Sequence, residues 1–102
     1  MAPEAAANKY IIRLCQMNAY LVEFIGTAFF LYVILATGNA FAIGAALAVA
    51  ITVGGPISGG SFNPAVTIML AAANKLPTKE VIPYILAEIA GGLAALELHK
   101  RI

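Results

Sequence analysis

The residues best suited to bind a solute are Asn63, Pro64 and Ala65, which interrupt an apolar part of the chain. Asparagine is a favoured N-cap and proline a favoured first helical residue, because proline has no N–H to leave unpaired and its φ is already helical. A helix is therefore predicted to begin at Pro64. The Asn63 side-chain oxygen would accept a backbone N–H there, leaving its NH₂ group free to donate to a solute. Asn-Pro alone also fits a plain helix start in a turn between two helices.

A glycine-rich segment from Gly54 to Phe62 precedes this helix start. Its glycines allow positive φ and close backbone approach, so we expect a loop whose carbonyl groups face passing solutes. The apolar run after Pro64 stops at Asn74, and about 10 residues at 1.5 Å each reach only about 15 Å, roughly half of a bilayer core. Residues 56–74 are thus predicted to form a re-entrant loop and half-helix. Non-helical backbone at membrane depth is tolerated only where protein buries it or where it lines a wet cavity, which indicates a pore or a site.

Two acidic residues, Glu23 and Glu88, lie inside otherwise apolar segments. A carboxylate at membrane depth is expensive. Both side chains should therefore face protein, where they are hydrogen-bonded or protonated.

The composition is that of a polytopic membrane protein. Of the 102 residues, 62% are hydrophobic and 11% charged, whereas charge is nearer one residue in four in soluble proteins. The formal net charge of +1 offers no electrostatic footprint for nucleic acid, so no nucleic-acid partner is expected. The single cysteine, Cys15, belongs to no metal-ligand spacing. With no nucleophile–base set or phosphate loop either, we predict that the chain is not an enzyme and that it holds no metal or cofactor.

The order of the predicted elements is simple. Residues 1–17 should form a tail and an interfacial segment, and three transmembrane helices are expected over 19–37, 40–55 and 80–98. Small residues recur at steps of four in the second and third of these helices, which is the pattern that lets membrane helices approach closely. The two stripes are Ala40, Gly44, Ala48 and Thr52, and Ala87, Gly91 and Ala95.

The run from Ser58 to Thr67 resembles the first Asn-Pro-Ala loop of the aquaporin and glycerol-facilitator family. Glu23 to Thr27 is similar to the Glu-x-x-Gly-Thr of that family's first helix, and the likeness covers about residues 18–98 in order and spacing. It implies an all-α integral membrane fold with three transmembrane helices and one half-helix, which is half of the family's fold. It also implies that Glu23 supports the loop by accepting its backbone N–H groups. Glu88 stands where the family usually has Gln, so its support role stays open.

The resemblance further implies which residues contact the solute. Ile43 stands, by the family's spacing, at a filter position of the second helix where an aromatic residue is usual, and Ser61 replaces a frequent His. Val66 follows Ala65, where the family's second Asn-Pro-Ala is followed by a filter Arg. The outlet would then be apolar and could as easily gate by dewetting as conduct. The full set of expected pore residues is Asn63, Pro64, Ala65, Gly59, Gly60, Ser61 and Ile43.

The family builds its pore from two such halves in inverted orientation, and this chain supplies one. Besides membrane lipid, its expected partner is therefore a second copy of itself or another membrane subunit. Four cationic residues on one side against two on the other do not forbid insertion both ways. One interpretation is a passive channel for water or small neutral solutes formed by two paired chains. The alternative is a non-conducting structural subunit of a larger membrane assembly.

Overall fold

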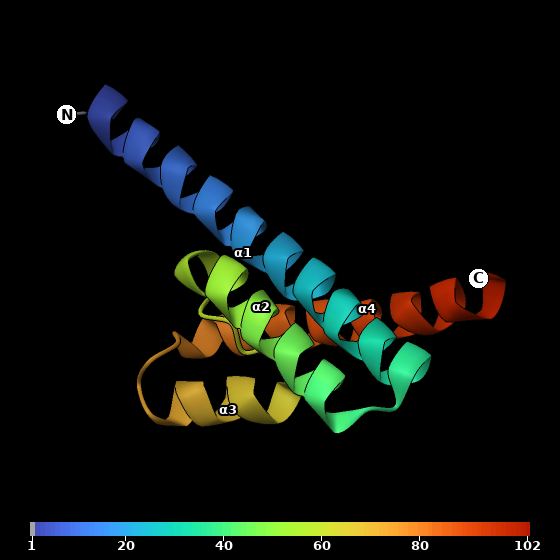
Figure 1. The fold of residues 1–102 in the computed structure, drawn as a ribbon. Coiled ribbons are helices and arrows are strands. Elements are labelled where there is room, and N and C mark those ends of the chain that lie inside the picture. Colours follow the sequence, from blue (N-terminus) through green and yellow to red (C-terminus); the bar gives the residue numbers. More distant parts are fainter. Residues whose placement is uncertain (1) are drawn as a thin grey trace.

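A computed structural model describes the backbone of residues 2–102 and the side chains of residues 8–102 (Figure 1). Throughout these residues the regular structure is helical and no strand occurs, which confirms the all-α prediction. Short connections join the elements, which are α1 (Ala2–Thr37), α2 (Ala40–Ser58), α3 (Pro64–Ala72), the 3₁₀ turn η1 (Thr78–Glu80) and α4 (Val81–Arg101).

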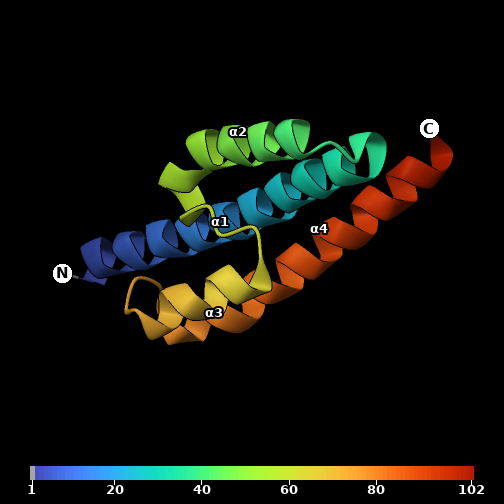
Figure 2. The same ribbon diagram turned by 60° about the horizontal axis from the view of Figure 1, so that its bottom comes forward.

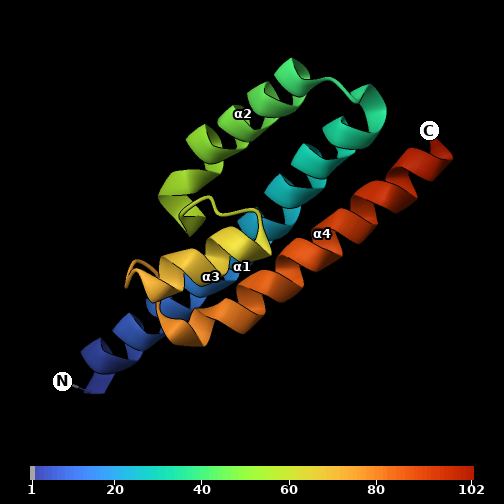
Figure 3. The ribbon, with the colours of Figure 1, turned by 90° about the horizontal axis from the view of Figure 1, so that it is seen from below.

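Helix α1 is the centre of the fold. It packs against α2 on one side and α4 on the other, and the short α3 lies against α4 (Figure 2). Seen from below, the connection after α2 carries the chain back to the middle of the bundle, so that α3 begins about halfway along α1 and α4 (Figure 3). This return positions the Asn63–Ala65 segment.

Three segments of the described chain are long and apolar enough to cross a membrane, namely Asn8–Thr37, Ala40–Ser58 and Thr78–Arg101. The nine residues of α3 extend only about 14 Å, too short for a hydrocarbon core of about 30 Å.

The segment 1–17, predicted as a tail and an interfacial segment, is continuous with the first spanning helix over the residues that the structure describes. Residue 1 lies outside them, and α1 begins at Ala2 instead of near residue 19. Alanine is the best helix former and proline is favoured in the first turn, so the Ala-rich start with Pro3 favours a continuous helix. At 36 residues α1 is about 54 Å long, more than a bilayer core requires.

The loop also begins later than its glycines suggest. Helix α2 continues through Gly54 and Pro56 to Ser58, past the end predicted near residue 55. Proline removes a backbone donor and bends a helix, and the last turns of α2 turn away from its axis in Figure 3. Positive φ is confined to the end of the segment, at Gly59 (φ 90°) and Gly60 (φ 67°) among its glycines.

Close approach explains why Gly54 is a glycine within the helix. A Cβ at this position would lie 2.7 Å from Val22 Cγ1 of α1, so the residue serves helix packing. On α4, a Cβ at Gly91 would likewise lie 2.5 Å from the Phe24 carbonyl oxygen. The helices therefore meet through small residues. This is usual in membranes, where lipid provides no hydrophobic driving force for helix association and close packing takes its place.

The small-residue stripe predicted for α2 does not face the other helices of the chain. The predicted residues Ala40, Gly44, Ala48 and Thr52 are all exposed. Contact between Gly54 and α1 turns a different series inward, also at steps of four, and its members are Ala46, Ala50, Gly54 and Ser58. On α4 the prediction is closer, because Gly91 and Ala95 are buried and Ala87 is half-buried.

Candidate solute site at the start of α3

Helix α3 begins at Pro64 with Asn63 as its N-cap, the start that the sequence predicts. Asn63 Oδ1 accepts a hydrogen bond from the Ala65 N–H at 2.8 Å, and the Asn63 carbonyl accepts the Thr67 N–H at 2.9 Å. The Asn63 side chain is exposed, and its NH₂ group donates no hydrogen bond to the described residues. Because the helix N-terminus carries partial positive charge, the free amide lies at an electropositive point.

The loop before Asn63 is held by Glu23, whose side chain is completely buried. One carboxylate oxygen accepts the backbone N–H of Phe62 at 2.8 Å and the hydroxyl of Ser61 at 3.1 Å. The other accepts the hydroxyl of Ser58 at 2.6 Å, and the Ser58 Oγ itself accepts the Gly60 N–H at 3.2 Å. A single acid of α1 thus satisfies donors from both the end of α2 and the loop.

Glu88 of α4 reaches the same cluster from the other side. Its Oε2 accepts the Thr67 hydroxyl at 2.7 Å and lies 3.2 Å from Ser61 Oγ. A serine hydroxyl has one hydrogen, so Ser61 can donate to either Glu23 or Glu88 but not to both at once. The Tyr84 hydroxyl, also from α4, donates to the Ser58 carbonyl at 2.8 Å. The loop is therefore hydrogen-bonded to α1 and α4 together.

A cavity of about 360 Å³ lies beside the start of α3. Two of its lining residues, Glu88 and Thr27, carry buried oxygens, Oε1 and Oγ1, that have no hydrogen-bond partner among the described residues. The remaining walls come mainly from apolar side chains, including Phe30, Leu31 and Leu93. Donors and acceptors around apolar walls suit the orientation of a small neutral molecule by hydrogen bonds. Among the described residues, no three His, Cys, Asp or Glu side chains are placed to hold a metal.

Most residues expected at the site lie together. Asn63, Pro64 and Ala65 form the start of α3, with Pro64 and Asn63 lining the cavity. Glu23 and Glu88 lie beneath the loop, as the hydrogen bonds above describe. Ile43 is remote from this cluster, since it lies about 22 Å along α2 from the helix end that adjoins the loop.

The loop residues expected to contact the solute differ in their exposure. Gly59 is exposed, whereas Gly60 and Ser61 are buried in the single chain. The Ser61 hydroxyl is engaged by Glu23, Thr67 and Glu88, so it faces protein. Ser61 is not among the residues that line the cavity beside the start of α3.

Sequence reasoning missed several members of the cluster. The residues predicted for the site do not include three members of the cluster, namely Ser58, Thr67 and Tyr84. Thr67 nevertheless follows Asn63 by four residues, and Tyr84 precedes Glu88 by four. Positions four apart share a helix face, so this spacing was the available signal. Nothing in the local sequence marks Phe62 for its positive φ of 50°, which non-glycine residues rarely adopt.

The fold and the site define an integral membrane protein with three spanning helices and a short capped helix that packs against α4. The family model of the major intrinsic proteins matches residues 36–102, and the chain belongs to that family. It is 41% identical over 88 residues to glycerol uptake facilitator protein-like 6 of Lactiplantibacillus plantarum, across 78% of this chain and 41% of that protein. It is 51% identical over 59 residues to aquaporin Z of Brucella melitensis, across 57% of this chain and 25% of that protein.

A third relative is the aquaglyceroporin AqpS of Rhizobium meliloti, 40% identical over 60 residues, across 59% of this chain and 26% of that protein. The matches thus cover less than half the length of these curated relatives. No solved structure matches the chain. The family's homologues are channels for water or glycerol.

Proposed function

We propose that this chain forms a passive membrane channel for water or small neutral solutes by pairing with a second copy of itself. The observation that carries the proposal is the start of α3, where Asn63 uses its oxygen as the N-cap and keeps its NH₂ group free. In the channel, the loop and α3 are re-entrant, and each solute accepts a hydrogen bond from this amide as it passes.

The surroundings of Asn63 favour neutral solutes. The positive end of the α3 dipole disfavours cations, and most of the cavity wall is apolar, so an ion finds few groups there to replace its hydration shell. Glu23 and Glu88 stabilise the loop that carries Asn63, because they accept its donors from opposite sides. Gly59, Pro64 and Ala65 border the solute path, and Ile43 lines its apolar outlet.

Pairing is part of the proposal because a single chain leaves the solute site open. Asn63 is exposed, and large apolar side chains are exposed along every spanning helix, for example Phe29, Val53 and Leu93. A second chain inserted in the opposite direction would cover Asn63 and bring a second α3 toward the first, an arrangement used by inverted-repeat transporters.

Stopped-flow osmotic shrinkage of proteoliposomes tests the role of Asn63. Asn63→Ser keeps an N-cap oxygen but lacks the amide donor, whereas Asn63→Leu lacks both. We expect either change to lower water permeability by up to about tenfold, the equivalent of one hydrogen bond of about 1.4 kcal/mol. Asn18→Leu, at an exposed position of α1 outside the site, is the matched control and should keep the parent permeability.

Two results would contradict the channel. One is unchanged permeability in Asn63→Ser with a normal circular dichroism spectrum. The other is a parent protein that adds no permeability to empty liposomes, which would favour the non-conducting structural subunit.

A further inference from the structure

Phe62 is an unusual loop residue. Of the side chains that the structure describes, its ring is among the largest that are fully buried, with 2% exposed, and its backbone has a φ of 50°. Non-glycine residues seldom hold such a φ unless their surroundings enforce it. Phe62 also directly precedes Asn63, so its position constrains where the Asn63 amide, the proposed solute donor, can lie.

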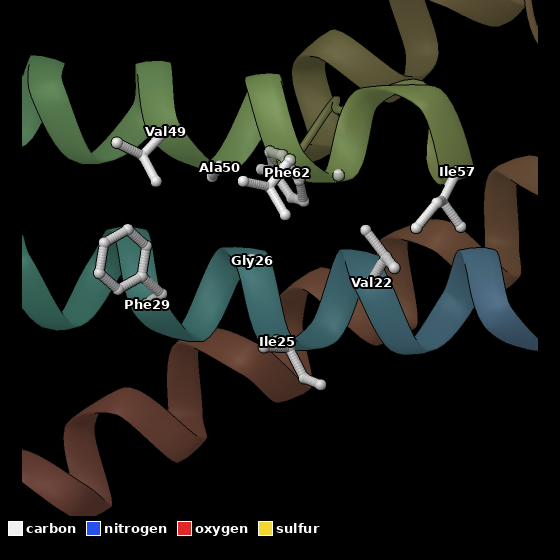
Figure 4. Close-up of a pocket in the computed structure, with 10 residues that line it drawn as sticks. Val22, Ile25, Gly26, Phe29, Val49, Ala50, Ile57 and Phe62 are labelled. Atoms are coloured by element: carbon white, nitrogen blue, oxygen red, sulfur yellow. The ribbon is translucent and has the colours of Figure 1, made fainter.

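The ring of Phe62 is wedged between α1 and α2 (Figure 4). A Cβ at Gly26 of α1 would lie 2.7 Å from Phe62 Cζ and 2.8 Å from Cδ1, and still nearer to Cε1. On α2, a Cβ at Gly54 would lie 3.0 Å from the same Cζ. Only glycine leaves room for the ring at Gly26, because real Cβ atoms are not found at such distances.

Phe62 lies beside two cavities. On one side is an apolar groove of about 330 Å³ between α1 and α2, where Phe29 and Val49 lie across from each other (Figure 4). On the other side is the cavity at the start of α3, which contains Asn63 and Glu88. Phe62 lines both, so it lies between the groove and the solute site.

We propose that Phe62 is the positioning residue of the solute site. It is held at two points, by its ring over Gly26 and Gly54 and by its N–H on Glu23 at 2.8 Å. With both points fixed, the next residue has little freedom, so the Asn63 amide is aimed into the cavity. This inference relies on the proposed function only where permeability is the readout.

The test displaces the ring without touching Phe62 or Asn63. Gly26→Ala places a methyl group where the ring lies, and Gly44→Ala is the matched control, because nothing lies within 4 Å of a Cβ at that exposed helical glycine. We expect Gly26→Ala to lower water permeability by up to about tenfold, the limit set by one hydrogen bond, and Gly44→Ala to leave it unchanged. If Phe62 acts through Asn63, adding Gly26→Ala to Asn63→Ser should cause no further loss. Independent, multiplying losses would overturn the proposal.

A second readout needs no conduction. Spin labels at Cys15 of α1 and at Met69→Cys of α3, both exposed positions, report the position of α3 by electron double resonance when the labelled chain is diluted with unlabelled protein. A narrow distance distribution in the parent should broaden or shift in Gly26→Ala and stay narrow in Gly44→Ala. If Gly26→Ala lowers only thermal stability and keeps the parent distribution, the ring merely packs and does not position α3. That result would reject the inference even if the channel is correct.

Discussion

Replacing Glu23 with leucine is the most informative perturbation of the buried cluster. The carboxylate accepts three hydrogen bonds, from the Phe62 N–H, the Ser58 hydroxyl and the Ser61 hydroxyl. Leucine has a similar size and no acceptor. Every donor that cannot turn to another partner is then left buried and unpaired.

The structure indicates which donors would be left without an acceptor in Glu23→Leu. The Ser61 hydroxyl can turn to Glu88 Oε2 at 3.2 Å, and the Ser58 hydroxyl to the Gly54 carbonyl at 3.4 Å. The Phe62 N–H has no such alternative, and a buried unpaired donor destabilises by about 1–3 kcal/mol. Adding about 1 kcal/mol for each weakened hydroxyl bond, Glu23→Leu should lower the free energy of unfolding by about 3–5 kcal/mol.

The assay is a denaturation titration with sodium dodecyl sulfate in mild-detergent micelles. Because the sequence has no tryptophan, far-UV circular dichroism is the readout. Glu97→Leu is the matched control, since Glu97 is an exposed acid of α4 that makes only surface ion pairs, with Lys100 and Arg101 at 3.4 Å. Such pairs contribute about 0–1 kcal/mol. Equal midpoints for the two leucine variants would refute the assignment of Glu23 as the support of the loop.

Three further predictions concern the helices around the site. Glu88→Leu should destabilise by about 0.5–1.5 kcal/mol, because the Thr67 hydroxyl loses its bond to Glu88 and keeps only Ser61 Oγ, at 2.9 Å, as an acceptor. Glu88→Gln keeps an acceptor and should be at least as stable as the parent in detergent melts; a leucine variant as stable as the parent would contradict this. Gly91→Ala should destabilise by about 1–3 kcal/mol, because its methyl group would lie 2.5 Å from the Phe24 carbonyl oxygen and force α1 and α4 apart; an unchanged melting temperature would show that the helices can separate freely. An impermeant maleimide added to sealed vesicles should label the exposed Cys15 in about half of the chains if the chain inserts in both orientations. A single orientation, reported by both the thiol and terminal tags, would exclude the inverted pair.

Local signals predicted the start of α3 because the chemistry there is local. Asn63 caps the helix with its own side chain and Pro64 has its φ fixed by its ring, so neither depends on distant contacts. The burial of Glu23 and Glu88 was also predictable, since an acid within a spanning helix must face protein.

The errors arose where packing overrides local preference. Gly54 and Pro56 are typical loop residues, yet the helix continues through both because Gly54 lets α2 approach α1. In an Ala-rich helix, more than one series at steps of four consists of small residues. Periodicity alone therefore could not tell that Ala50 faces the core and Ala48 does not. The positive φ of Phe62 follows from its seat between two helices, which no local pattern encodes.

The most direct test of the central claim mixes parent and Asn63→Ser chains before reconstitution and measures water permeability at a constant total amount of protein. If two chains make one channel and each must supply its Asn63 amide, an equal mixture should retain about one quarter of the parent permeability above the Asn63→Ser level. Retention of about one half would show that each chain conducts alone, and no conduction by the unmixed parent would show that these chains by themselves form no channel.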